Sequence, residues 1–255
     1  MINRIVNKPL RLFSLLVGVF FLISWSSVNE ITIYMIGDST MADKPYDNGN
    51  PEKGWGQVFP LYFKEAVRIE NHAVNGRSTK SFIDQGRWEV VREKITPGDY
   101  VIIEFGHNDA KKEDSTRFAD TNTTYRWNLE KFVDETREMG GIPILATPIV
   151  RRRFDEEGNF YDVHGDYPKV VREVAVEKNV ILLDMHSKSE ALLIQYGEEN
   201  SKQLFLHIAP GEYPSLPDGK TDDTHFSPTG AFRICDLAVE EIKLKVSELA
   251  GFFKE

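Results

Sequence analysis

The chain has 255 residues, 41% of them hydrophobic and 28% charged, which is the composition of an ordinary globular protein with a full core. Its formal net charge of -9 argues against nucleic acid as a partner, because phosphate binding needs a broad basic surface. The single cysteine, Cys235, excludes an internal disulfide framework and a cysteine-rich metal site. We expect it to be a small buried residue.

The N-terminus resembles a secretory leader. Basic residues Arg4, Lys8 and Arg11 precede an apolar run over residues 12–25, and small serines follow it. The run is shorter than the roughly 20 residues that a bilayer span needs. We therefore predict a signal peptide over residues 1–27, a mature domain over residues 28–255, and a secreted or periplasmic protein without stable membrane association. A retained N-terminal anchor is the alternative.

Short β-rich runs alternate with helical patterns along the rest of the chain. Several of the β-rich runs are apolar throughout, as a parallel strand covered on both faces requires. The predicted strands are residues 31–36, 67–71, 100–105, 142–146 and 180–183. The predicted helices are residues 55–65, 87–94, 121–139, 167–178, 185–196 and 228–249. This alternation predicts a single-domain α/β fold, a three-layer sandwich around a mostly parallel, doubly wound five-stranded sheet.

Polar, glycine-rich corners follow the first four predicted strands. They are residues 37–39, 73–78, 106–109 and 147–148. Ligands of open α/β sheets bind outside the carboxyl ends of the strands, so these corners should collect at one functional edge. The irregular stretches 42–54 and 149–165 are expected to lie over the same edge, and a third, 207–223, leads into the last helix.

Ser39, in the first of these corners, is the candidate nucleophile. A serine hydroxyl is weakly nucleophilic alone and needs a base, a group that orients the base, and donors for an oxyanion. His225 is the candidate base because Asp222 precedes it by three residues, a spacing that lets a carboxylate bond to Nδ1 and leaves Nε2 facing the serine. Asp223 is the alternative orienting carboxylate. The other interpretation of His225 is a residue that caps the last helix.

Three groups are candidates for the oxyanion hole. They are the backbone N–H groups of Ser39 and Gly76 and the side-chain amide of Asn108. Gly76 lacks a Cβ and so allows close approach of the chain. A turn glycine and a strand-end asparagine that caps backbone groups are the structural alternatives.

Together these residues resemble the four sequence blocks of the SGNH hydrolases, also called GDSL hydrolases. The matches are Ser39 in Gly-Asp-Ser-Thr, Gly76 in Asn-Gly-Arg-Ser, Asn108 in Gly-His-Asn-Asp, and Asp222 with His225 in Asp-x-x-His. The resemblance runs from residue 31 to about residue 231 in the expected order. It implies a flavodoxin-like sandwich and a hydrolase that cleaves esters.

Further features are similar to one branch, the rhamnogalacturonan acetylesterases. They are Thr40 after the serine, Gly-Arg-Ser after the second strand, Phe-Gly-His-Asn-Asp, the arginines at 151–153 and Asp-x-Thr-His-Phe-Ser-Pro. This likeness implies removal of acetyl groups from a pectic polysaccharide by a Ser39–His225–Asp222 acyl-enzyme mechanism, without a metal or organic cofactor. The implied partner is an acetylated acidic polysaccharide or oligosaccharide. The sequence sets no oligomeric state.

Substrate contacts are expected from several side chains near the predicted edge. Arg151, Arg152 and Arg153 form a dense basic cluster, and an arginine fork suits the carboxylate of an acidic sugar. A solvated face or internal ion pairs are the alternatives for these arginines. Trp55 is a candidate for stacking on a sugar ring, with core packing as its alternative. His107 is expected to shape the site without acting as the base.

Other functions use different features of the sequence. Within the same superfamily, an esterase for another acetylated carbohydrate such as xylan, a lipase or a thioesterase is the nearest alternative. A glycoside hydrolase would use two carboxylates about 5 to 9 Å apart, but no spacing singles out a pair. A non-enzymatic carbohydrate-binding protein would not need both Ser39 and His225.

Overall fold

The computed structural model describes residues 31–254. The predicted signal peptide, residues 1–27, therefore lies outside the described residues. Seven strands are present in this part of the chain: β1 Ile31–Gly37, β2 Val67–Asn71, β3 Tyr100–Glu104, β4 Ile142–Ala146, β5 Ile181–Leu183, β6 Phe205–Ile208 and β7 Lys220–Phe226. The helices are α1 Trp55–Val58, α2 Thr79–Asp84, α3 Arg87–Arg92, α4 Thr124–Glu138, α5 Tyr167–Glu177, α6 Met185–Ser201, α7 Pro228–Lys245 and α8 Ser247–Ala250.

Strands β1 to β5 form one sheet in the order β2-β1-β3-β4-β5. Every neighbouring pair in this sheet is parallel, with β1 pairing to β2 on one side and to β3 on the other. The predicted single-domain sandwich with a doubly wound five-stranded sheet is confirmed. This order is the flavodoxin-like one, in which the chain winds outward in both directions from the point between β1 and β3.

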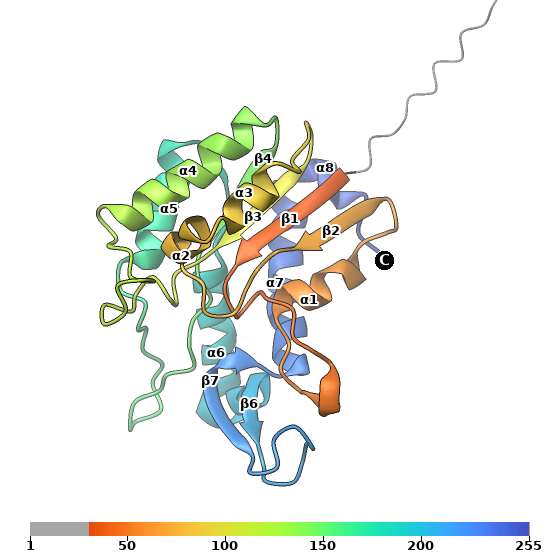
Figure 1. Ribbon diagram of the computed structural model, residues 1–255. Coiled ribbons are helices and arrows are strands. Elements are labelled where there is room, and N and C mark those ends of the chain that lie inside the picture. Colours follow the sequence, from red (N-terminus) through yellow and green to blue (C-terminus); the bar gives the residue numbers. More distant parts are fainter. Residues whose placement is uncertain (1–30, 255) are drawn as a thin grey trace, which may run out of the picture.

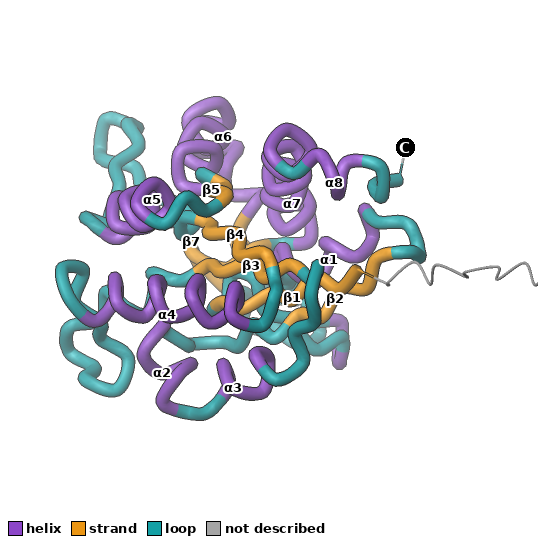
Figure 2. Tube along the Cα trace, turned by 90° about the horizontal axis from the view of Figure 1, so that it is seen from above, coloured by secondary structure: helices purple, strands orange, loops and turns teal. Residues whose placement is uncertain are grey.

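Helices cover both faces of the sheet, because alternate residues of the central strands are apolar on both sides. Ile33 and Met35 of β1 pack into one core with α1, α6 and α7, whereas Tyr34 and Ile36 pack into the other core with α2 to α5. Figure 2 shows α2, α3 and α4 on one side of the strands and α6 and α7 on the other. Cys235 is buried in the first of these cores, as its helical pattern predicts.

The helical predictions differ from the structure where turn chemistry intervenes. The predicted helix 55–65 consists of α1 and a 3-10 turn, Phe59–Tyr62, and the chain is extended again at Phe63. Helix α2 was not predicted, although Ser78 and Ser81 form a reciprocal capping box at its start. The predicted helix 228–249 is divided into α7 and α8 by the non-helical Val246.

The two ends of the irregular stretch predicted at residues 207–223 belong to a hairpin, whereas residues 209–219 between its strands are irregular as predicted. β6 and β7 pair antiparallel as a separate two-stranded sheet directly before α7. In Figure 1 the blue hairpin lies beyond the end of the sheet toward which the β1 arrow points. At Gly230, an added Cβ would lie 1.8 Å from the Leu204 carbonyl oxygen, so only glycine lets the first turn of α7 sit against the segment that leads into β6.

Within residues 31–254, none of the helices combines the length and the apolar character that a membrane crossing requires.

Candidate active site

Ser39 lies in the turn that follows β1, in the crevice between the ends of β1 and β3. The carboxylate of the preceding residue, Asp38, shapes this turn by accepting hydrogen bonds from the Thr40 backbone N–H at 3.0 Å and the Thr40 hydroxyl at 2.9 Å. Ser39 itself is 9% exposed. The strand therefore delivers a partly exposed hydroxyl to the position where ligands bind in folds of this order.

The structure brings His225 and Asp222 together with Ser39. His225 Nε2 lies 2.9 Å from Ser39 Oγ, and His225 Nδ1 lies 2.8 Å from Asp222 Oδ2. The backbone N–H groups of Thr224 and His225 also donate to Asp222 Oδ1. Partial burial acts to raise the pKa of Asp222, but the hydrogen bonds from His225 outweigh it and hold the pKa well below its usual range. The carboxylate thus stays ionised and fixes the imidazole.

Asp223, the alternative partner of His225, points to other groups. It forms ion pairs with Arg152 at 3.0 Å, Arg153 at 3.2 Å and His207 at 2.8 Å. Successive residues of an extended strand face opposite sides, which explains why two adjacent aspartates on β7 have different partners. His225 belongs to this strand and does not cap the following helix, whose N-cap is Ser227.

A cavity of about 370 Å³ surrounds the serine. It is lined by Ser39, Glu52, Asn75, Gly76, His107, Asn108, Lys111, Arg151, Thr224 and His225. A larger cavity of about 430 Å³ opens between residues 110–122 and 163–167, but neither Ser39 nor His225 lines it. The smaller cavity is therefore the candidate active site.

Three hydrogen-bond donors stand in or beside this cavity. Within residues 31–254, the backbone N–H groups of Ser39 and Gly76 have no acceptor. Gly76 has φ +74°, a left-handed conformation, and an added Cβ would meet only Arg117 at 3.8 Å. Backbone conformation, rather than the close approach predicted above, is therefore the reason for glycine here. The Asn108 amide donates to the Arg77 carbonyl at 3.1 Å, which leaves its second N–H hydrogen for the cavity.

Buried acidic groups lie beneath the serine turn. Burial and the nearby Asp38 charge raise the pKa of Glu104 to about 8, so Glu104 is protonated at neutral pH. Burial also opposes ionisation of Asp38, but His107 holds the pKa of that carboxyl at about 2, with His107 Nδ1 at 3.2 Å from Asp38 Oδ2. The three side chains lie close enough to hold a cation. Because Thr40 and Trp55 already donate to the carboxyl groups, we interpret the cluster as a hydrogen-bond network.

Of the three arginines predicted to bind substrate, one lines the cavity. Arg151 donates to the Thr224 hydroxyl at 2.5 Å and forms part of the wall. Arg152 is buried, bonded to Asp223, the Glu198 carbonyl and Ser201, so its prediction as a substrate contact is wrong. Arg153 pairs with Asp223 and is absent from the cavity wall.

The prediction that Trp55 stacks on a sugar is also wrong. Its side chain is fully buried at the start of α1, and its indole N–H donates to Glu104 at 2.8 Å. Because neither ring face reaches solvent, a ligand cannot stack there, and the residue instead closes the core behind the serine turn. His107, by contrast, lines the cavity as expected.

Sequence reasoning missed four residues of the cavity wall: Glu52, Asn75, Lys111 and Thr224. Lys111 follows Asn108 by three residues in the same turn, and Asn75 precedes Gly76, so proximity to the matched blocks was an available signal for both. Glu52 belongs to no matched block, and its only signal was its place in the irregular stretch 42–54 that was expected over this edge. Lys44 links Glu52 to the other wall residues, because its ammonium group lies 2.8 Å from Glu52 Oε1 and 2.5 Å from Asn75 Oδ1.

This fold and this site define an esterase of a known class. The model of the GDSL-like lipase/acylhydrolase family matches residues 35–231, and the chain belongs to that family. It is a carboxylic ester hydrolase. The predicted resemblance to the SGNH or GDSL hydrolases and to their rhamnogalacturonan acetylesterase branch is confirmed.

Individual relatives extend over most of the chain. The rhamnogalacturonan acetylesterase RhgT of Bacillus subtilis is 41% identical over 213 residues, which cover 84% of this chain and 90% of that protein. A probable rhamnogalacturonan acetylesterase of the same organism, YesY, is 34% identical over 83% of this chain and 92% of its own length. The crystal structure of B. subtilis YxiM matches with a TM-score of 0.74 and 27% identity, over 88% of this chain and 59% of that one.

Proposed function

We propose that this protein is a serine esterase that removes acetyl groups from a plant cell-wall polysaccharide, most specifically rhamnogalacturonan. The observation that carries the proposal is the chain of contacts from Asp222 through His225 to Ser39, at 2.8 and 2.9 Å, on the wall of one cavity. The two relatives named as rhamnogalacturonan acetylesterases support the substrate class.

In the first half of the reaction, Ser39 Oγ attacks the acetyl carbonyl carbon. His225 Nε2 takes the serine proton, and the ionised Asp222 stabilises the imidazolium and keeps Nε2 directed at the hydroxyl. Collapse of the tetrahedral intermediate breaks the ester bond. The sugar oxygen leaves with the proton from His225, and the acetyl group remains on Ser39.

In the second half, water attacks the acetyl-enzyme. His225 removes a proton from the water, and the second tetrahedral intermediate collapses to acetate and free Ser39. In both halves, the oxyanion is stabilised by the N–H groups of Ser39 and Gly76 and by the Asn108 amide. Such fixed donors are the largest single source of acceleration in acyl transfer.

The cavity wall supports a polar, acidic substrate. Lys111 and Arg151 place two cations beside the nucleophile, and the one carboxylate among the lining residues, that of Glu52, is paired with Lys44. A carboxylate on a neighbouring sugar would pair with such cations. A lipase would instead present a broad apolar surface beside its serine, so the wall favours carbohydrate over lipid esters.

Replacement of the nucleophile tests the mechanism. Ser39→Ala should lower kcat on an activated acetate ester by roughly 10⁴-fold or more, because the reaction loses its acyl-enzyme step. The variant should keep the melting temperature of the parent, since Ser39 fills little of the core. Near-normal turnover by a folded Ser39→Ala protein would refute the assignment.

A substrate panel tests the polysaccharide. Acetate release would be measured on acetylated rhamnogalacturonan, acetylated xylan and long-chain acyl esters, with the Ser39→Ala protein as the blank. We expect the highest kcat/KM on rhamnogalacturonan. A strong preference for xylan or for long acyl chains would overturn the substrate while leaving the esterase mechanism in place.

The leader sequence gives the proposed location. We propose that residues 1–27 direct export and are removed, so that the esterase acts outside the cytoplasm. N-terminal sequencing of the protein recovered from its producing cells should find a chain that begins near residue 28. Recovery of the intact N-terminus in the membrane fraction would support the anchor instead.

A further inference from the structure

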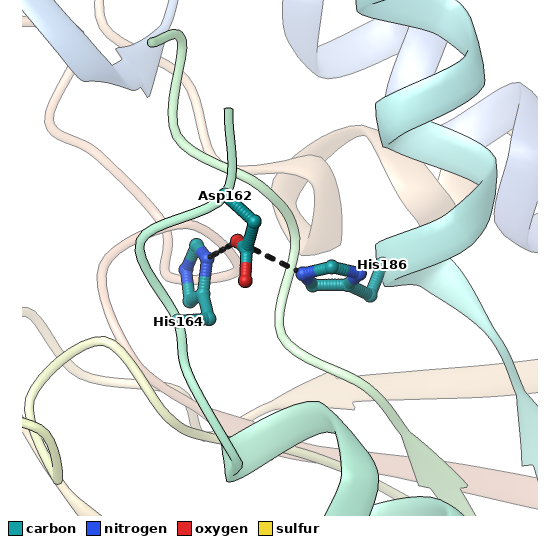
Figure 3. Close-up of side chains that lie close together, drawn as sticks. All are labelled: Asp162, His164 and His186. Atoms are coloured by element: carbon teal, nitrogen blue, oxygen red, sulfur yellow. Dashed lines mark hydrogen bonds and ion pairs between the residues drawn. The ribbon is translucent and has the colours of Figure 1, made fainter. Parts of the chain in front are cut away.

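A second cluster of ionisable side chains lies outside the esterase site. Asp162 and His164 come from the stretch that precedes α5, and His186 comes from the first turn of α6. Asp162 Oδ1 lies 2.8 Å from His164 Nδ1 and 3.1 Å from His186 Nε2. Figure 3 shows the carboxylate between the two imidazoles. We propose that Asp162, His164 and His186 bind a divalent transition-metal ion, with Zn²⁺ as the best fit.

The donor set is the first argument for this site. Two imidazole nitrogens and one carboxylate oxygen are a recurrent three-ligand set for zinc, with water as the fourth ligand. The ligand atoms of the three residues all lie within 4.8 Å of one another. In a tetrahedral zinc site, neighbouring ligand atoms are about 3.4 Å apart. The two separations from Asp162 Oδ1, 2.8 and 3.1 Å, would open by about 0.6 and 0.3 Å to reach this value.

Burial and access are the second argument. His164 and His186 are 4% and 7% exposed, so both rings are held in place by their surroundings. The Asp162 side chain is 29% exposed and forms the solvent side of the cluster. An ion can therefore enter past Asp162, and a water ligand can remain on that side.

The proton positions on both imidazoles allow ligation. Ligation requires that the nitrogen facing the ion carry no proton, so the proton of each neutral ring must lie on the other ring nitrogen. Ligation through His164 Nδ1, the nitrogen that faces Asp162, leaves the ring proton on Nε2, which is buried and has no hydrogen-bond partner within the described residues. When metal binds at Nε2 of His186, the proton moves to Nδ1, which faces Glu190 Oε2 at 4.0 Å. A carboxylate behind a ligating histidine is the usual outer partner of a zinc site.

The ion would act as a structural clamp and take no part in the ester chemistry. The irregular stretch 149–165 contains Arg151, a residue of the cavity wall, near its start and His164 near its end. His186 belongs to α6, the helix that follows β5 in the chain. A metal bond between them ties this stretch to the body of the fold. The rings of His164 and His107 are 4.9 Å apart, so the clamp also supports a residue of the esterase cavity.

The proposal is tested by measuring metal binding to the full mature chain. The protein carries no histidine tag and is first freed of metal with a chelator. Titration with Zn²⁺ should show about one equivalent bound with a dissociation constant of about 1 μM or lower, and a rise in melting temperature. His186→Ala should weaken binding by about 100-fold or more, and Glu190→Gln by about tenfold. His72→Ala is the matched control, because His72 also pairs with a single carboxylate, Glu70 at 3.0 Å, and should bind as the parent does.

The proposal is overturned if the parent binds less than a tenth of an equivalent under these conditions. It is equally overturned if one equivalent binds and His186→Ala leaves the affinity unchanged, because the ion then lies elsewhere. If His186→Ala does not fold, Asp162→Asn replaces it. That variant keeps the side-chain shape and removes the anionic ligand, so unchanged affinity there has the same meaning.

Discussion

The two sides of the esterase cavity are built in different ways. On one side, Ser39, Gly76 and Asn108 follow three adjacent parallel strands, and each side chain or N–H group is positioned by a buried sheet. On the other side, Asp222 and His225 belong to a two-stranded hairpin outside that sheet, and Arg151 belongs to an irregular stretch. The sheet therefore positions the proposed nucleophile and oxyanion donors, whereas the hairpin and the irregular stretch position the proposed base and the proposed substrate contact.

After replacement of Ser39, the largest loss of kcat is expected from a substitution in the hairpin. Asp222→Asn should lower kcat by roughly 10³- to 10⁴-fold, because an amide favours the wrong imidazole tautomer and does not stabilise the imidazolium. The measurement is steady-state hydrolysis of an activated acetate ester. Asp223→Asn is the control on the same strand, and it should lose about 2–3 kcal/mol of stability through Arg152 while kcat changes little. Equal losses of kcat in both variants would show that the hairpin acts only as a structural unit.

The sheet side is tested by removal of a single donor. Asn108→Ala should lower kcat by about 10²- to 10³-fold with little change in KM, because the amide stabilises charge that develops only in the transition state. Asn128→Ala serves as the control, since its amide bonds to Thr79 and does not line the cavity. A rise in KM at constant kcat would instead place Asn108 in ground-state binding.

The buried carboxyl group under the sheet side makes stability depend on pH. Glu104 has a folded pKa of about 8 against an unfolded value of 4.5, so the folded state retains a proton that the unfolded state has lost. Its stabilising contribution is complete below about pH 4.5 and is lost as the pH rises to about 8. Glu104→Gln keeps a neutral side chain at all pH values and should remove this loss, which is on the order of a few kcal/mol.

Urea unfolding of the parent and of Glu104→Gln at pH 5 and pH 8.5 measures this difference. The parent should lose more stability than the variant between the two pH values. Identical losses would mean that Glu104 is ionised in the folded protein at neutral pH. Glu135→Gln is a suitable control, because the neighbouring Lys131 helps to lower the pKa of that carboxyl group and its site lies outside the cavity.

The smallest change in the kinetic constants is expected from Arg151, in the cavity wall. Arg151→Ala should raise KM about tenfold for an acetylated oligosaccharide that carries carboxylates, because one charge-assisted contact is lost. It should leave KM for a neutral acetate ester unchanged. Arg153→Ala removes a nearby arginine that is absent from the wall and should change neither constant. If Arg153→Ala raised KM equally, the effect would come from net charge and not from contact.

The positions of the central strands were predictable because β1, β3 and β4 are buried on both faces. The predicted strands at residues 67–71 and 142–146 coincide with β2 and β4, and the others differ at their ends by one residue. The corners after β1, β2 and β3 then follow from topology alone. For this reason the sequence alone was sufficient to predict that Ser39, Gly76 and Asn108 share one cavity.

The hairpin and the buried tryptophan were less predictable, since their environment comes from contacts distant in sequence. β7 reads Lys-Thr-Asp-Asp-Thr-His-Phe, a polar run with no apolar alternation, so its strand conformation depends on pairing with β6. Trp55 has an aromatic ring suited to sugars, and its burial becomes evident only from its packing in the core and its bond to Glu104, 49 residues away in the chain. Arg151 and Arg152 are adjacent in the sequence and differ only in the direction of their side chains.

The proposed nucleophile and its proposed base are 186 residues apart in the chain, one shortly after the first strand and the other just before the last long helix. During synthesis, Ser39 emerges from the ribosome long before His225 does. A nascent or truncated chain that stops before residue 225 carries a serine hydroxyl with no base to activate it. If Ser39 and His225 have the roles proposed above, esterase activity requires a chain synthesised through β7, and shorter products should have none.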